Sequence, residues 1–138
     1  MKNFLIICAI AVGFTACKKD AGEGGTSVIE GQVYKIHTSQ NFLTGEMDTL
    51  YYQLDSGKDV FIIYSDNETD VYNDKFETDY NGKYRFEYLR KGDYTLYTYA
   101  DSIDASNVDY DYPIFRHIKI NSNNSDNSIE DFVIEKNQ

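Results

Sequence analysis

The stretch TDYNGKYRFEYLRKGDYTLYTY, residues 78–99, decides the fold. Within residues 83–88 aromatic and charged side chains alternate, which is the period of two that a strand with one buried face shows. Asn81 and Gly82 come just before, and both tolerate the positive φ of a two-residue hairpin turn. The stretch therefore predicts a β-hairpin that enters this strand, and another strand after Gly92.

Similar short segments recur along the chain between turn-forming residues. The thirteen Tyr and eight Phe favour strands, and no segment has helical periodicity. We expect a seven-stranded antiparallel β-sandwich over residues 28–138. Besides the two strands in the opening stretch, the expected strands cover residues 28–36, 59–64, 69–78, 113–120 and 129–135, and a further candidate covers residues 49–54 in the irregular stretch 37–57.

The first sixteen residues are typical of a leader. Lys2 gives a positive start, residues 4–13 are apolar but too short to span a bilayer, and small residues precede Cys17. This pattern resembles the lipobox of bacterial lipoprotein signal peptides. The resemblance implies cleavage after residue 16 and lipidation of Cys17, which would anchor the protein to a membrane. The alternative is an ordinary secretory signal cut nearby.

Residues 17–27 are small, charged and glycine-rich, and predict a flexible tether between anchor and sandwich. Charged residues directly after a lipidated cysteine resemble the segments that route some lipoproteins to the outside of the outer membrane. We therefore expect an extracytoplasmic, lipid-anchored domain, on the outer membrane and exposed at the surface. Cys8 lies in the leader, so the expected mature chain has no free thiol and no disulfide.

The expected sandwich resembles the carboxypeptidase regulatory-like and collagen-adhesin B-type families, whose fold is prealbumin-like (transthyretin-like). Its most specific segment has the pattern T-D-x-x-G-x-Y-x-F-x-x-L-x-x-G-x-Y-x-L, which is complete here. Residues 37–57 and the acidic stretch before Pro113 depart from the family pattern. The resemblance implies a scaffold without catalysis. It is carried by Gly31, Gln32, Val33, Val60, Phe61, Ile62, Thr78, Asp79, Gly82, Tyr84, Phe86, Leu89, Gly92, Tyr94 and Leu96.

Charge and motif content limit the possible functions. The formal net charge is −10 and no basic patch is visible, which excludes a nucleic-acid partner. The two histidines, His37 and His117, lie in none of the sequence motifs of hydrolases or zinc enzymes. We expect a module without catalysis that has a structural or protein-interaction role at the cell envelope.

A calcium site is the sharpest chemical hypothesis. Residues 100–112 are expected to form an acidic loop, and its carboxylates are the hard oxygen ligands that Ca²⁺ prefers. The spacing does not match an EF-hand, and a solvated acidic loop is the alternative. The candidate ligands are Asp101, Asp104, Asp109 and Asp111.

Tyrosines near this loop suggest a binding platform. Tyr97 and Tyr99 have the opposite parity to Tyr94 and Leu96, so they are expected on the exposed face of their strand. The second functional hypothesis is therefore an accessory carbohydrate- or peptide-binding lipoprotein. Its recognition surface would consist of the acidic loop and of Tyr97, Tyr99, Tyr110 and Tyr112.

Overall fold

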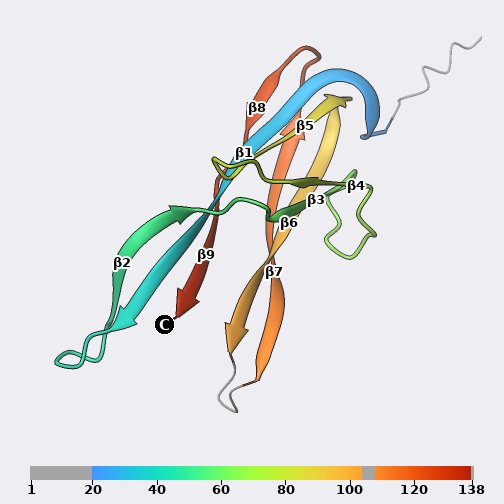
Figure 1. Cartoon of the computed structure of the whole chain (residues 1–138). Helices are drawn as coiled ribbons and strands as arrows, with labels where there is room; N and C mark the ends of the chain where they lie inside the picture. Colours follow the sequence, from blue (N-terminus) through green and yellow to red (C-terminus); the bar gives the residue numbers. More distant parts are fainter. Residues whose placement is uncertain (1–19, 104–107, 138) are drawn as a thin grey trace, which may run out of the picture.

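The computed structural model describes residues 20–103 and 108–137 (Figure 1). These residues form an all-β, sandwich-like fold, and they contain no helix that could cross a membrane. Nine strands make two sheets: β1 (Glu23–Gln40), β2 (Met47–Leu54), β3 (Asp59–Ile63), β4 (Asp74–Glu77), β5 (Lys83–Leu89), β6 (Gly92–Ile103), β7 (Asp109–Ile120), β8 (Asp126–Ser128) and β9 (Phe132–Asn137).

The five-stranded sheet is built on β1. Antiparallel strands β5 and β2 pair with its first and second halves, and β8 and β9 run parallel to the same two halves. The expectation of seven strands, all antiparallel, is therefore wrong for this sheet. Strand β8 lies in a polar stretch whose composition is typical of a turn, yet it pairs with β1. The Asn127 side chain supports this pairing by donating a hydrogen bond to the Val28 carbonyl at 2.9 Å.

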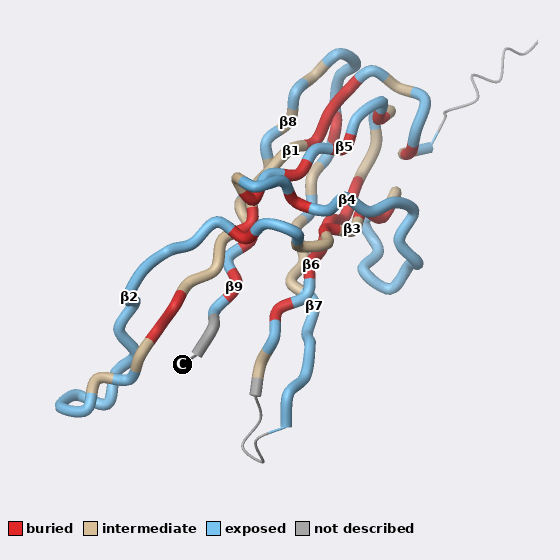
Figure 2. Tube along the Cα trace, viewed as in Figure 1, coloured by how far each residue is buried: buried red, intermediate tan, exposed pale blue. Residues whose placement is uncertain are grey.

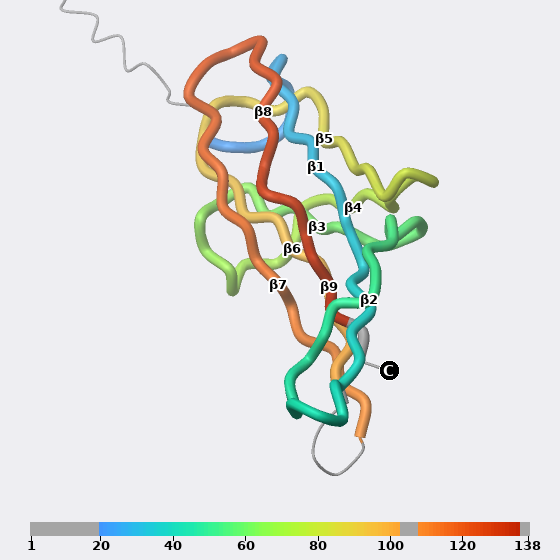
Figure 3. Tube along the Cα trace, turned by 90° about the vertical axis from the view of Figure 1, so that its left-hand side faces the viewer, coloured from blue at the N-terminus to red at the C-terminus, as the bar shows by residue number. Residues whose placement is uncertain are grey.

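The four-stranded sheet has the order β4-β3-β6-β7 and is antiparallel throughout. Its central strand β3 lies within the predicted segment 59–64. The predicted strand 69–78 is shorter than expected, because only Asp74–Glu77 pairs with β3. The long strands β1, β6, β7 and β9 run roughly along the long axis of the molecule, whereas the short strands β3 and β4 run across it (Figures 1 and 3).

The turn at Asn81-Gly82 connects the two sheets and is not a β-hairpin. Gly82 has a φ of 68° and its amide donates to the Asp79 carbonyl at 2.9 Å, so the predicted turn chemistry is present. However, β4 pairs with β3 whereas β5 pairs with β1. The chain therefore passes from one sheet to the other at this turn. Between the two sheets, the ring of Phe76 on β4 packs against that of Phe86 on β5, with centroids 6.2 Å apart.

The core lies between the sheets, at the middle of the molecule (Figure 2). Removing each large apolar side chain from water stabilises the fold by about 1.5–3 kcal/mol. The aromatic and leucine residues of the opening motif are nearly all part of this core. Buried members of the core are Ile29, Val33, Val60, Ile62, Tyr84, Phe86, Leu89, Tyr94, Leu96, Ala100, Ile120, Phe132 and Ile134.

Two hairpin arms extend past the core toward the same end of the molecule (Figures 1 and 2). One is the β1–β2 hairpin, in which β2 is exposed along its whole length. The other is the β6–β7 hairpin, whose register continues from Tyr99↔Pro113 to Ile103↔Asp109. The predicted acidic loop 100–112 is therefore wrong, since residues 100–103 belong to β6 and residues 109–112 belong to β7. The arm forms because the strands continue to pair beyond the sandwich.

The predicted tether 17–27 is wrong for its described part, because β1 begins at Glu23 and the residues before it pack on the sandwich. The Tyr94 hydroxyl accepts from the Gly22 amide at 2.9 Å and donates to the Arg90 carbonyl at 2.7 Å. The Arg90 amide in turn donates to the Gly22 carbonyl at 2.8 Å. The predicted signal peptide 1–16 and the lipidation site Cys17 lie outside the described residues.

Candidate functional site

Five rings gather on the outer face of the four-stranded sheet. We call this cluster the aromatic face: Phe61 on β3, Tyr72 in the β3–β4 connection, Tyr97 and Tyr99 on β6, and Phe115 on β7. The register pairs Tyr97 with both Phe61 and Phe115, which puts these three on one face. Side chains of neighbouring positions, such as Ile62 and Leu96, point to the opposite face and are buried in the core.

Ring contacts hold the aromatic face together. Tyr97 stacks on Phe61 with centroids 4.9 Å apart, and lies 5.4 Å from Phe115. Tyr99 meets the Tyr97 ring edge-on at 5.6 Å, and Tyr72 meets Phe61 edge-on at 4.9 Å. Stacked and edge-to-face contacts each stabilise by about 0.5–1.5 kcal/mol. The rings therefore form one preorganised surface.

Exposure increases from the centre of the aromatic face to its rim. Tyr97 is 9% exposed, whereas Tyr99 is 38% and Tyr72 is 46% exposed. Burial raises the pKa of Tyr97, and a side-chain hydrogen bond with Tyr99 raises it further. The hydroxyl of Tyr97 therefore stays protonated at neutral pH. The rim presents ring surface to solvent, which is unusual for a cluster of this size on a monomer and marks a candidate binding surface.

A shallow depression of about 390 Å³ adjoins the aromatic face, within the size range of small-molecule sites. Phe61 and Tyr99 contribute ring surface to it. The carboxylate of Asp59 binds the Lys75 ammonium at 2.9 Å, and this hydrogen bond raises the pKa of Lys75. The depression thus combines rings with charged groups. Its lining also includes Gly57, Lys58 and Glu77.

Beyond Tyr97 along the strands, polar side chains connect the sheet to the 64–73 loop. The Thr95 hydroxyl lies 3.0 Å from His117 Nδ1 and donates to the Ser65 carbonyl at 2.8 Å. His117 Nε2 lies 2.9 Å from a Glu68 carboxylate oxygen. The hydroxyl is therefore committed to a backbone acceptor, and the arrangement positions the loop next to the aromatic face.

The four predicted platform tyrosines do not form one surface. Tyr97 and Tyr99 lie on the outer face of the sheet. The register pairs Tyr110 with Ser102, and Tyr112 with the buried Ala100, so these two share the core-facing side of the β6–β7 arm. Their rings lie 6.2 Å apart and contact each other. The predicted platform therefore divides into two surfaces, because residues from two paired strands share a face only when the register aligns them.

The predicted calcium ligands are only partly assembled. Asp101 lies directly opposite Asp111, and Asp109 is opposite Ile103. Asp104 lies outside the described residues. No group of three or more metal-ligating side chains occurs among residues 20–103 and 108–137. Asp101 and Asp111 supply two carboxylates on the same face of the sheet as Tyr99.

Sequence reasoning identified Tyr97 and Tyr99 but missed the other rings of the aromatic face. Phe61 lies in a continuous apolar run, so its outward direction is not visible from alternation. Phe115 has the opposite parity to the apolar Ile114, Ile118 and Ile120, which is a usable signal. Tyr72 lies in the β3–β4 connection, where no strand alternation indicates the direction of its side chain.

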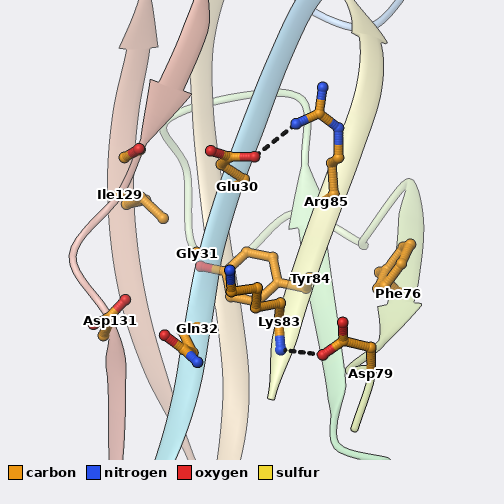
Figure 4. Close-up of a pocket in the computed structure, with 11 residues that line it drawn as sticks. Glu30, Gly31, Gln32, Phe76, Asp79, Lys83, Tyr84, Arg85, Ile129 and Asp131 are labelled. Carbon is orange, nitrogen blue, oxygen red and sulfur yellow. Dashed lines mark hydrogen bonds and ion pairs between the residues drawn. The ribbon is translucent and has the colours of Figure 1, made fainter. Parts of the chain in front are cut away.

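A second hollow, of about 450 Å³, lies on the other sheet (Figure 4). Tyr84 lies in it beside Gly31, and a side chain at residue 31 would begin 2.3 Å from the Tyr84 hydroxyl. That hydroxyl is sealed from solvent and has no hydrogen-bond partner among the described residues. Because no ligand could reach it, Tyr84 fills the core here. The rim carries the ion pair of Glu30 with Arg85 at 2.6 Å.

Comparisons with known proteins give no family. No family model matches the chain, and no curated protein matches it. One similar solved structure is that of a Pseudomonas aeruginosa protein for which carbohydrate binding is proposed. Its sequence identity to this chain is 12% and its TM-score is 0.47, over 84% of this chain and 92% of that chain. A likeness of this degree assigns neither a family nor a ligand to the chain.

Proposed function

We propose that the protein is a binding module without catalysis at the cell envelope, and that the aromatic face is its recognition surface. The observation that carries this proposal is the contiguous cluster of five rings, with Tyr72 and Tyr99 half exposed beside a depression lined by charged groups. Exposed rings of this kind stack on sugars or pack against side chains of a protein partner.

A purely structural module is the second candidate, and the aromatic face argues against it. A sheet needs no rings on its solvent side, and a role as spacer is served equally well by charged residues. Exposed aromatic clusters persist where something covers them part of the time. Catalysis is not part of the proposal; Asp59 and His117 beside the face contact Lys75 and Glu68.

The anchor is the second part of the proposal: Cys17 carries lipid and holds the domain on a membrane, at the surface of the outer membrane. The start of β1 lies at the end of the sandwich opposite to the arms (Figure 1). A membrane attached through Cys17 would therefore lie at that end. Replacing Cys17 with Ala should move the protein from the membrane to the soluble fraction, and unchanged retention would refute the anchor.

We also propose that the domain belongs to the prealbumin-like families that the opening motif resembles. The burial of Tyr84, Phe86, Leu89, Tyr94 and Leu96 supports this assignment. Strands β5 and β6 place these side chains in the core, as the motif requires. The two arms and the short β8 would then be additions particular to this chain.

Photo-crosslinking in the source cells tests the recognition surface without knowledge of the ligand. A photoreactive phenylalanine analogue replaces Tyr99 or Tyr72, and the controls carry it at Tyr80 or Tyr88, which are 84% and 70% exposed and do not belong to the aromatic face. We expect discrete adducts from positions 99 and 72 only. Equal labelling at all four positions would contradict the proposal, because the controls are more exposed.

A further inference from the structure

Two carboxylates lie opposite each other at the end of the aromatic face. Asp101 on β6 pairs with Asp111 on β7, one row beyond Tyr99 and Pro113 on the same face of the sheet. Both are exposed, and neither has an ion-pair partner among the described residues. Like charges directly opposite on neighbouring strands destabilise a sheet. The arrangement therefore has a cost to folding, and no cation among the described residues relieves it.

Two lysines near the aromatic face are neutralised, because Lys75 binds Asp59 at 2.9 Å and Lys119 binds Asp93 at 3.0 Å. A third, Lys58 in the lining of the depression, makes no ion pair in the described part of the chain. The pair of Asp101 and Asp111 likewise has no cation bound to it among the described residues, in a chain whose formal net charge is −10. Asp109, the next position of the same parity on β7, adds a further negative charge toward the tip of the arm.

Building on the proposed function, we propose that the aromatic face binds a cationic segment of a partner protein, with a Lys or Arg side chain across Tyr99 and its charged group at Asp101 and Asp111. Successive residues on one face of a strand are roughly 7 Å apart. A Lys or Arg side chain matches this spacing, because its apolar stem can lie on a ring while its head reaches the next row. Ring and carboxylates would then both stabilise the cation.

A protein segment fits this surface better than a metal ion. Ca²⁺ prefers six to eight oxygen ligands, whereas the two carboxylates supply a fraction of that shell. Rings do not ligate calcium, but they do attract guanidinium and ammonium groups. The contiguous rings and acids extend along two paired strands, which suits the alternate side chains of an extended segment.

The test uses a fluorescent ten-residue peptide of alternating Arg and Ser, and a matched peptide with Gln in place of Arg. Anisotropy is measured with the full chain in detergent and with chelator present. We expect saturable binding of the Arg peptide only. Tyr99→Ala, and separately the double variant Asp101→Asn with Asp111→Asn, should each weaken it by roughly tenfold.

The control variant combines Glu46→Gln with Glu135→Gln, which removes the same charge from exposed positions in the β1–β2 connection and on β9. Its affinity should stay within about twofold of the unmodified chain. An equal loss in this control would overturn the inference, since binding would then follow net charge alone. Folding is checked by thermal melting, and the Asp101/Asp111 variant should melt no lower than the unmodified chain because a repulsion is removed.

Two other outcomes would overturn the inference. If Ca²⁺ raises the melting temperature of the unmodified chain but not of the Asp101/Asp111 variant, the carboxylates bind metal. If position 99 crosslinks to a glycan and the Arg peptide does not bind, the aromatic face recognises sugar. The second outcome leaves the proposed function intact. Absence of any specific crosslink at positions 72 and 99 would contradict both the proposed function and this inference.

Discussion

The outer faces of the two sheets are covered in different ways. On the β1–β5 face, Arg85 binds Glu30 at 2.6 Å and Glu87 at 2.7 Å, so charged side chains neutralise one another in solvent. On the four-stranded sheet, the corresponding positions carry the aromatic face, with Tyr99 at 38% exposure. Rings are exposed on both sheets, since Tyr52 on β2 is 66% exposed and Tyr88 on β5 is 70% exposed. On the four-stranded sheet, ring contacts join the rings into one cluster. This cluster is the reason for our proposal that the aromatic face serves recognition.

The largest effect should come from the interior that both faces share. Ile62 is fully buried, although its neighbour Phe61 is part of the aromatic face. Ile62→Ala should lower the free energy of unfolding by about 2–5 kcal/mol, because it removes packed methyl groups and leaves a cavity. Urea denaturation measures this. A loss below about 1 kcal/mol would show that the core is not where the structure places it.

Tyr94→Phe should have the next largest effect, by releasing the chain before β1. The change removes the partner of the Gly22 amide and of the Arg90 carbonyl. We expect a loss of about 1–3 kcal/mol, since two polar backbone groups lose their hydrogen bonds. Hydrogen exchange at Gly22 is the specific measurement. Unchanged exchange would contradict this account. Slow exchange in both proteins would mean that the Gly22 amide has another partner, and fast exchange in both would support the flexible tether that the composition of residues 17–27 predicts.

Tyr99→Ala and Arg85→Ala compare the two faces directly. Arg85→Ala should leave the melting temperature nearly unchanged, because exposed ion pairs contribute little to stability. Tyr99→Ala should lower it more, because this side chain is 38% exposed and its ring packs against Tyr97. Their effects on recognition should differ. Crosslinking from position 72 should fall in the Tyr99 variant and stay the same in the Arg85 variant. A fall in both would mean that the β1–β5 face also binds the partner.

Tyr84→Phe should have the smallest effect. Its hydroxyl is sealed in the core without a partner among the described residues, and burial raises the pKa of this tyrosine. Removing a buried hydroxyl that makes no hydrogen bond should leave stability unchanged or raise it slightly. Thermal melting checks this. A drop of several degrees would indicate that the hydroxyl has a partner, and would make the hollow near Gly31 a candidate site.

Local sequence pattern predicted which residues of β5 and β6 face the core, because alternation depends on the strand alone. It could not predict that β4 and β5 lie in different sheets. Turn chemistry at Gly82 is compatible with a β-hairpin and with a connection between the two sheets. Which of the two forms depends on packing across the interior. The length of the β6–β7 arm was missed for a related reason. Polar residues such as Asp101 and Asp111 lower strand propensity, but pairing with a neighbouring strand overrides it.

The candidate site was predicted only in part, because it is a property of register. Tyr99 and Tyr112 are both near the acidic stretch, but the pairing of β6 with β7 puts them on opposite faces. The same register joins Tyr97 with Phe115, a residue that lies eighteen positions further along the chain. Membership of the aromatic face therefore follows from tertiary structure and not from proximity in sequence.

Tyrosine footprinting would test the central claim most directly. Chemical iodination of the purified protein should modify Tyr72 and Tyr99 on the aromatic face, and also Tyr80 and Tyr88 outside it, since all four are exposed. In intact source cells we predict that Tyr72 and Tyr99 are protected, whereas Tyr80 and Tyr88 react as before. Equal reactivity of the four tyrosines in cells would contradict the assignment of recognition to the aromatic face.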